Sequence, residues 1–312
     1  MPALQDIRGG VPNAQIDWVV ERAFAPLVQR CEGVRRVIAC ELRRWSKSPL
    51  SSGTRSEWRA FRNELQSEVY DAIIDLQGLT KSALVARVAS LAPGGKRYAL
   101  ANQTEGSSYE APTRWAADVA LPVATRIHAV QRSRELCARA LGYEIPIYQG
   151  FRVLARIDRA PGAIENIATR CVAWVHGTSR EDKCWPEAHW IELGRRLVDQ
   201  GCTLGLPHGN DAERERSERL AAALGTRAAV WPRLDPGALA DRLAACFGVI
   251  GVDSGPSHIA VALGLPHVQI YNFDTAWRTG PVDGSRQLSV FARPTPSVDA
   301  VWQAWQSVCP PL

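Results

Sequence analysis

The sequence of 312 residues has no apolar run near the ~18 residues that a membrane-spanning helix needs, and it begins without a charged-then-apolar leader. We therefore expect a protein that stays in the cytosol. Low-complexity segments are missing as well, and 46% of the residues are apolar against 22% charged. This composition excludes a disordered or collagen-like chain. At ~100–200 residues per domain, the length fits one large domain or, more readily, two.

Lysine is scarce, because only four of the 37 basic residues are lysine, and the net charge is a mild +5. The sequence has no basic helix interleaved with aromatic residues and no known nucleic-acid motif, so we expect no nucleic acid among its partners. Arginine binds phosphate and carboxylate through a planar fork. The composition is therefore compatible with an anionic partner.

No two of the eight cysteines form a CxxC pair, and the six histidines lack metal-ligand spacing. Zinc-protease (HExxH), nucleophile-elbow (GxSxG) and Walker sequences are also missing. Most cysteines lie in apolar runs, such as Cys171 in CVAWV and Cys246 in LAACFGVIGV. We therefore expect buried free thiols and neither a disulfide framework nor a metal site.

Short apolar runs alternate with amphipathic segments, which is typical of βαβ units and mostly parallel sheets. In the first half we expect strands at 15–21, 34–41, 70–76 and 97–100, and helices around 56–68, 79–91 and 127–142. In the second half we expect strands at 171–176, 202–207, 228–231, 249–253 and 267–271, and helices at 187–200, 211–224, 236–246, 257–263 and 297–308. The predicted fold class is α/β with two Rossmann-like domains.

The regular alternation lapses in a polar stretch around 156–166 that contains Pro161 and Gly162, and we place the domain boundary there. The predicted domains are 1–155 and 156–295, followed by a last helical segment at 296–312.

The opening residues Pro2–Arg8 have the pattern of the second half of a helix that ends at Gly9-Gly10. A doubly wound domain normally begins with a strand and a turn before such a helix. We therefore expect the first domain to lack its first strand, which leaves the two neighbouring strands with unpaired edges.

Polar residues gather where predicted strands end, and ligands bind at the carboxyl ends of strands in open α/β sheets. After the strand at 171–176, the hydroxyls of Thr178 and Ser179 and the ammonium of Lys183 can converge on a phosphate. Thr and Ser are also common in loops that only cap a helix. A phosphate site and a capped connecting loop both remain open for this segment.

Two further strand ends carry similar residues. Asp253-Ser254-Gly255 precedes a predicted helix whose N-terminus favours anions, while the Asp253 carboxylate suits sugar hydroxyls. The same residues could form a simple turn with Ser257 as a helix cap. Glu213, after the turn at 207–210, could accept from sugar hydroxyls or merely stabilise the first turn of its helix.

Basic residues follow two strands of the first half. Arg43, Arg44 and Lys47 come after one strand, and Gln77 and Lys81 after another. The helix at 56–68 and the turn before it add Arg55, Arg59 and Arg62. We expect these cations to form a basic mouth on one side of the first domain, although a solvated charged face has the same composition.

Six segments, in order along the chain, resemble the lipopolysaccharide heptosyltransferases, which are ADP-heptose glycosyltransferases of family 9 with GT-B architecture. They are IDWVVERAF, VIACELRRW, YDAIIDLQGLTKSA, HGTSREDKCWPEAHW, LPHGNDAERERSERL and FGVIGVDSGPSHIAVALGLP. The Thr-Ser-x-x-x-Lys-x-Trp-Pro and Asp-Ser-Gly-x-Ser-His blocks are specific to this group. The match in the first half favours the heptosyltransferase I branch over the heptosyltransferase II branch.

The resemblance implies an inverting enzyme that moves L-glycero-D-manno-heptose from ADP-heptose to Kdo of Kdo2-lipid A during synthesis of the lipopolysaccharide inner core. It implies that residues 1–155 bind the acceptor, that 156–295 bind ADP-heptose across a cleft, and that the helix at 296–312 crosses back to the first domain. We further expect no cofactor, no metal and a monomer, located in the cytoplasm and peripherally on the cytoplasmic face of the inner membrane.

Carried over residue by residue, the resemblance assigns a donor role to residues of the second domain. Thr178, Ser179 and Lys183 would hold the diphosphate, with Lys183 stabilising the departing ADP. Glu213 would contact donor hydroxyls and Leu234 would line the adenine site. Around the heptose and its phosphate would lie Asp253, Ser254, Gly255 and His258. The acceptor side would be formed by Arg43, Arg44, Gln77 and Lys81.

Members of the family begin with a strand and a Ser-x-Gly-Asp turn whose aspartate is taken as the general base, and this turn is expected upstream of Met1. Two other interpretations therefore stay open. One is a heptosyltransferase II-like enzyme with an already heptosylated acceptor. The other is a nucleotide-sugar-binding protein whose catalysis is impaired because the base is missing.

Overall fold

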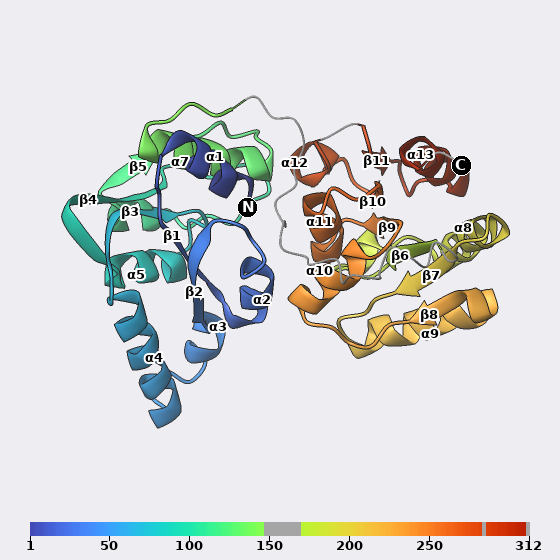
Figure 1. The fold of residues 1–312 in the computed structure, drawn as a ribbon, viewed down its shortest axis with the longest axis horizontal. Helices are drawn as coiled ribbons and strands as arrows, with labels where there is room; N and C mark the ends of the chain where they lie inside the picture. The colour runs from blue at the N-terminus through green and yellow to red at the C-terminus, as the bar shows by residue number, and fades with distance from the viewer. Residues whose placement is uncertain (147–169, 283–284, 310–312) are drawn as a thin grey trace. The chain divides into compact units, whose positions relative to one another are not determined.

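The computed structural model describes residues 1–146, 170–282 and 285–309. Contacts divide the chain into two compact units, and the break between them falls within 147–169. The predicted domain boundary at 155/156 therefore lies outside the described residues. Both units combine parallel strands with helices (Figure 1), so the α/β prediction is confirmed.

The second unit contains a six-stranded parallel sheet in the order β11-β10-β9-β6-β7-β8. Its strands are β6 (Cys171–Val175), β7 (Thr203–Leu206), β8 (Ala228–Val230), β9 (Gly248–Val252), β10 (His267–Tyr271) and β11 (Gln287–Phe291). The chain starts at the centre with β6, adds β7 and β8 on one side, and then crosses to β9, β10 and β11 on the other. The order reverses between β6 and β9, and this switch point is where open α/β sheets bind ligands.

Five of the second unit's helices have clear sequence signals. They are α8 (Glu187–Asp199), α9 (Asp211–Leu224), α10 (Pro236–Ala244), α11 (Gly255–Ala262) and α13 (Val298–Val308), and a short α12 (Ala276–Thr279) was not expected. The side chains of Asn210, Asp235 and Ser297 accept hydrogen bonds from first-turn N–H groups and so fix where α9, α10 and α13 begin.

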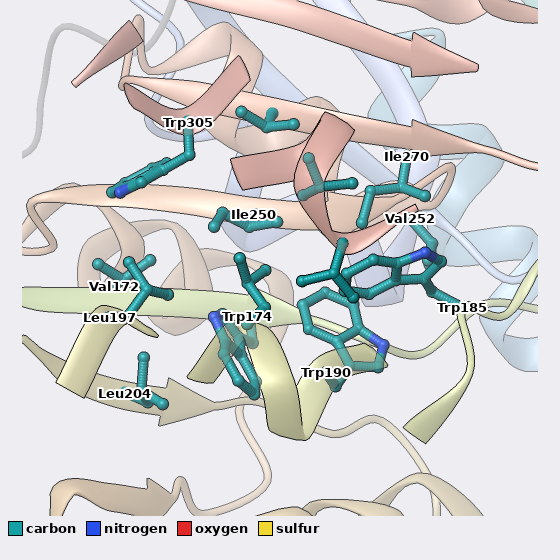
Figure 2. Packing of buried hydrophobic residues seen from close by; sticks show 14 of the residues in the cluster. Val172, Trp174, Trp185, Trp190, Leu197, Leu204, Ile250, Val252, Ile270 and Trp305 are labelled. Atoms are coloured by element: carbon teal, nitrogen blue, oxygen red, sulfur yellow. The ribbon is translucent and has the colours of Figure 1, made fainter. Parts of the chain in front are cut away.

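The core of the second unit is built around tryptophan. Trp190 of α8 packs against Trp174 of β6 and against Trp185, with ring centroids 4.9 and 5.1 Å apart. Figure 2 shows these indoles among aliphatic side chains of the sheet, with Trp305 of α13 in the same cluster. Such large, fully buried rings hold the sheet and its helices together through area removed from water.

Two glycines of β9 let helices approach the sheet from opposite faces, because alternate residues of a strand point to opposite sides. A Cβ on Gly248 would lie 2.7 Å from the Trp305 ring of α13. A Cβ on Gly251 would lie 2.4 Å from Ser257 Oγ of α11. Helix α13 packs in the core of the second unit, and the crossing back to the first domain expected for this helix stays a prediction.

The first unit contains two separate parallel sheets. In one, β1 (Ile16–Glu21) pairs with β2 (Val34–Cys40); in the other, the order is β3 (Val69–Asp75), β4 (Ser90–Leu100) and β5 (Val119–Leu121). Within the part of the chain that the structure describes, β1 and β3 each have a strand neighbour on one side. The open edges expected from the sequence are therefore present. The sheets are linked instead by side chains, since Tyr70 of β3 donates to Asp17 Oδ2 of β1 at 3.0 Å.

The helices of the first unit are α1 (Pro2–Gly10), α2 (Ala25–Val28), α3 (Leu42–Trp45), α4 (Ser52–Leu65), α5 (Thr80–Val88), α6 (Thr113–Ala116) and α7 (Ala129–Leu141). Strand β4 is longer than the predicted 97–100. Its register against β3 shifts between Tyr70 and Ala72, which bulges the Pro-Gly-Gly segment that normally signals a turn. No helix among the described residues has the length and apolar character to span a bilayer.

A buried ion pair fastens α1 to α7. The guanidinium of Arg134 donates to both carboxylate oxygens of Asp6, at 2.6 and 3.1 Å, and also to the Pro146 carbonyl at 2.9 Å. Asp6 is 3% exposed and Arg134 is 5% exposed. A buried charge is tolerated when its partner and hydrogen bonds are in place, so each residue depends on the other.

We predict that Asp6→Ala lowers the free energy of unfolding of the first unit by about 3–5 kcal/mol, because it leaves the Arg134 guanidinium buried without a counter-charge. Urea denaturation measures this change. The matched control is Glu105→Ala, which breaks the exposed pair with Arg126 and should cost about 0–1 kcal/mol. Equal effects of the two variants would contradict the structural role assigned to the buried pair.

Candidate functional site

Asp253 connects the two loops that follow β6 and β9. Its carboxylate Oδ2 lies 2.7 Å from Lys183 Nζ, and Oδ1 lies 3.6 Å from His258 Nε2. The hydroxyl of Thr178 donates to the Asp253 carbonyl at 3.2 Å. Side chains from both predicted strand-end motifs are thus brought together at the switch point.

Lys183 remains available to a ligand despite its ion pair. Its side chain is 20% exposed, whereas that of Asp253 is 8% exposed. An ammonium has three N–H donors, and the contact with Asp253 uses one of them. The arrangement orients the lysine while leaving donors that could bind an anion.

The N-terminus of α11 is open to an anion. Ser254 is its N-cap residue, but the side chain makes no capping hydrogen bond, and the buried Oγ has no partner among the described residues. Ser257 donates to the Val252 carbonyl at 2.7 Å instead of capping the helix, so the capping alternative is wrong. A Cβ on Gly255 would meet nothing within 4 Å. Space is therefore open beside Gly255, at the end of α11 where the helix dipole favours an anion.

Glu213 lies against the loop that follows β6. A Cβ on Gly177 would be 2.5 Å from Glu213 Cδ, so a larger residue there would displace the Glu213 carboxylate. Glu213 Oε2 accepts from the Gly209 N–H at 2.6 Å, and its own N–H donates to Asn210 Oδ1 at 2.9 Å. Glu213 thus supports the start of α9, while Oε1 accepts no hydrogen bond among the described residues and could still accept one from a ligand.

Ser179 and Leu234 are less well integrated. Ser179 is exposed in the loop before Lys183, and Leu234 is half-buried between β8 and α10. Both follow strands at the same edge of the sheet, but no described contact joins them to Asp253. Their assigned roles stay predictions.

The basic residues of the first unit are only partly as expected. Arg43 and Arg44 lie on α3, after β2, and both are exposed. Arg44 Nη2 donates to the carboxylates of Glu41 and Glu57, so its charge is locally balanced, whereas no acid pairs with the Arg43 side chain among the described residues. The basic mouth is therefore less positive than predicted.

Gln77 and Lys81 are exposed beyond the end of β3. This turn is fixed by the buried Asp75, which accepts from the N–H groups of Gln77 and Gly78 at 2.9 and 3.3 Å. Arg43 and Arg44 follow β2, which belongs to the other sheet. No hydrogen bond between described residues connects them to Gln77 or Lys81. Their common acceptor role stays a prediction.

A family model described as glycosyltransferase family 9 (heptosyltransferase) matches residues 58–300. Lipopolysaccharide heptosyltransferase 1 of Pseudomonas aeruginosa is 39% identical over 280 residues, which cover 87% of this chain and 74% of that protein. The chain belongs to glycosyltransferase family 9. The predicted family resemblance is confirmed, and the family 9 chain is a glycosyltransferase.

Two further comparisons define its place in family 9. The structure of Escherichia coli heptosyltransferase WaaC with ADP matches with a TM-score of 0.85 at 34% identity, covering 97% of this chain and 92% of that one. Lipopolysaccharide heptosyltransferase 2 of Escherichia coli is 26% identical over 273 residues, or 83% of this chain and 74% of that protein. The chain is thus closer to the type 1 than to this type 2 heptosyltransferase.

Sequence reasoning missed two residues that contact Asp253 or the loop that carries Lys183. Thr279 of α12 donates to Asp253 Oδ1 at 3.3 Å, and Asn272 bonds to the loop that carries Lys183. Both follow β10, which lies beside β9. The signal available in the sequence was position alone, because a strand adjacent to a site strand ends at the same edge of the sheet.

All eight cysteines are free, as expected, but only half of them are buried, namely Cys31, Cys40, Cys137 and Cys202. The expected absence of a metal stays a prediction. In 1–146, 170–282 and 285–309, no three His, Cys, Asp or Glu side chains gather so that they could hold a metal ion.

His176 directly follows β6 and is the first residue of the loop that carries Lys183. Its Nε2 is 2.7 Å from Ser217 Oγ of α9, and the residue is fully buried. Burial lowers the pKa of His176 to about 4, and the positive charge of Arg216 acts in the same direction. The imidazole is therefore neutral at pH 7 and ties the loop to α9 without adding charge to the site.

Burial also lowers the pKa of His267 to about 4. An unfolded histidine has a pKa of about 6.5, so between pH 6.5 and 4 the unfolded chain binds more protons than the folded one. We predict that the free energy of unfolding of the second unit does not change with pH above ~6.5 and falls as the pH drops below that value. The loss reaches roughly 3 kcal/mol per histidine once the pH is below the folded-state pKa of about 4.

Urea unfolding at pH 7.5, 6 and 5 measures this loss. His176→Asn retains a polar partner for Ser217 but cannot titrate, so it should reduce the loss between pH 7.5 and 5. A wild-type stability that stays constant over this range would show that the two imidazoles are not held neutral by burial.

Proposed function

We propose that this glycosyltransferase moves a heptose from ADP-heptose to Kdo of Kdo2-lipid A with inversion at the anomeric carbon. The observation that carries the proposal is the meeting of Lys183 and the N-terminus of α11 at Asp253. Family membership, the type 1 relative and the likeness to the ADP-bound WaaC structure support it.

In this proposal the diphosphate of the donor lies between Lys183 and the start of α11. Ammonium donors, backbone N–H groups at Ser254 and Gly255, and the hydroxyls of Thr178 and Ser179 would receive its oxygens. Negative charge on the ADP grows as the glycosidic bond breaks, so donors fixed in advance stabilise the transition state more than the ground state. Lysine and the helix dipole then supply the charge, and we propose that the reaction uses neither a metal nor a cofactor.

The sugar and the base would be held beside the diphosphate. Glu213 Oε1, the Asp253 carboxylate and His258 are the groups available for heptose hydroxyls, and Leu234 offers an apolar contact to adenine. Inversion requires the acceptor hydroxyl to attack from the face opposite the ADP while a base takes its proton. The family assigns that base to a Ser-x-Gly-Asp turn, a motif that does not occur in residues 1–312.

For the acceptor, we propose that the exposed cations after β2 and β3 contact the carboxylates and phosphates of Kdo2-lipid A. Arg43 is better suited than Arg44, because no described acid competes for it. Gln77 and Lys81 would add contacts from the turn after β3. We infer that the enzyme acts peripherally on the cytoplasmic face of the inner membrane, because the proposed acceptor is a lipid. We also propose that it works as a monomer.

A transfer assay tests the function. The protein is incubated with ADP-heptose and either Kdo2-lipid A or the same acceptor already carrying one heptose, and products are resolved by mass spectrometry. Heptose added to Kdo2-lipid A alone supports the proposal, whereas addition only to the heptosylated acceptor would indicate a type 2 specificity. Binding of ADP-heptose without any transfer would favour the binding-protein interpretation.

We predict that Lys183→Ala weakens ADP binding by roughly 1.5–3 kcal/mol, the range for a hydrogen bond to a charged group. The variant removes the ammonium and also exposes the phosphates to the uncompensated Asp253 carboxylate. Calorimetric titration with ADP measures the change. Arg180→Ala is the control, because Arg180 carries the same charge in the same loop but pairs with the exposed Asp182. Unchanged affinity in Lys183→Ala would remove this lysine from the phosphate site.

We also predict that Arg43→Ala raises the Kd for Kdo2-lipid A about fivefold, since an exposed charge contact contributes up to ~1 kcal/mol. Added salt should weaken wild-type binding more than binding of the variant, because screening acts on the lost contact. The Kd for ADP should not change. Arg227→Ala, at an exposed site of the second unit, controls for net charge. Equal losses in both variants would reject a specific acceptor role for Arg43.

A further inference from the structure

The loop that carries Lys183 is hydrogen-bonded to a residue that follows β10 and has no part in the proposed donor contacts. Asn272 directly follows β10, and its Nδ2 donates to two carbonyls, those of Asp182 at 3.0 Å and Cys184 at 2.9 Å. These are the carbonyls of the two residues that flank Lys183. Thr295 Oγ1 donates in turn to Asn272 Oδ1 at 2.7 Å.

This set of bonds uses the whole carboxamide. Both hydrogens of Nδ2 are donated to the loop, and Oδ1 accepts from a separate segment, so the amide plane is fixed at both ends. Aspartate has nearly the same shape but offers no donor to the two carbonyls. The bonding pattern therefore requires the amide, and size alone does not explain it.

A second anchor acts just beyond Lys183. The indole Nε1 of the buried Trp185 donates to the Pro296 carbonyl at 2.9 Å. The short turn Glu181–Lys183 is thus held by residues 272 and 295–296, which come from the β10 and β11 side of the sheet. Because β10 pairs with β9, these anchors fix the position of the Lys183 backbone relative to the sheet that carries Asp253.

We propose that Asn272 is a positioning residue, which fixes the backbone on both sides of Lys183 so that its ammonium stays at Asp253 and on the donor diphosphate. The lysine side chain itself is a flexible four-carbon stem, so its reach depends on where its backbone is held. A misplacement of about 1 Å at a reacting group can be costly. This inference rests on the proposed function of Lys183 in donor binding.

A double-mutant cycle tests the proposal, with the Kd for ADP as the readout. Asn272→Ala in the otherwise wild-type protein should raise the Kd about tenfold. In the Lys183→Ala background the same change should have less than about a twofold effect, because no ammonium is left to position. A merely structural role for Asn272 would weaken ADP binding by the same factor in both backgrounds, and this outcome would overturn the proposal.

The matched control is Asn102→Ala in the first unit. Asn102 makes the same kind of bonds, donating to the Gln103 and Val123 carbonyls and accepting from the Val123 N–H. It should alter stability to a comparable extent and leave the Kd for ADP unchanged. Loss of ADP affinity in this control equal to that in Asn272→Ala would assign the effect to general destabilisation and overturn the proposal.

A milder variant covers the case in which Asn272→Ala does not fold. Thr295→Val removes the donor to Asn272 Oδ1 and keeps both bonds to the loop, so a two- to threefold rise in Kd is expected, again absent in the Lys183→Ala background. If the Kd for ADP rises in neither Asn272→Ala nor Thr295→Val while Lys183→Ala still weakens binding, the inference about Asn272 is overturned and the proposed function is not. No effect of Lys183→Ala itself would overturn the proposed function.

Discussion

The contact between Asp253 and Lys183 is the constraint on which the geometry of the second unit's site depends. A carboxylate that is 8% exposed must be paired or hydrogen-bonded to remain charged, and Lys183 and Thr279 meet that need. The two ends of the ion pair come from loops after different strands. Satisfying one buried charge therefore fixes the distance between the two loops that would surround a ligand.

Sheet topology makes this contact possible. Residues 183 and 253 are far apart in sequence, but β6 and β9 are hydrogen-bonded neighbours, so their carboxyl ends lie side by side. Both strands are buried on both faces, where Trp174, Ile250 and the glycines of β9 pack against helices. The hydrophobic core thus fixes the strand ends. The hydrogen bonds of Trp185 and Asn272 in turn fix the loop that carries Lys183.

The sequence was informative where burial is strong and poor where local signals compete. Continuous apolar runs identified β6 and β9, and adjacency at the switch point brought Lys183 to Asp253. Strand β11 was missed because its one buried residue is the polar Gln287, so no apolar run marks it, and β4 was predicted only at 97–100 because Pro-Gly-Gly imitates a turn. The pairing of Arg44 with Glu57 and the bonds of Asn272 are tertiary contacts that leave no periodic pattern in the sequence, so they could not be predicted. The packing partner of α13 could not be predicted either, because its apolar face fits either unit until Gly248 is placed beneath Trp305.

The polar groups around the loop after β6 divide into charged and neutral ones, and this division determines where attraction for an anion arises. His176 begins this loop, but burial lowers its pKa to about 4, so at neutral pH it contributes no charge. Arg180 is paired with Asp182 in the exposed part of the loop. Lys183 is itself balanced by Asp253. If the site binds a diphosphate as proposed, its attraction depends strongly on the dipole and N–H groups of α11, with Lys183 acting as a directed donor held in place by Asp253.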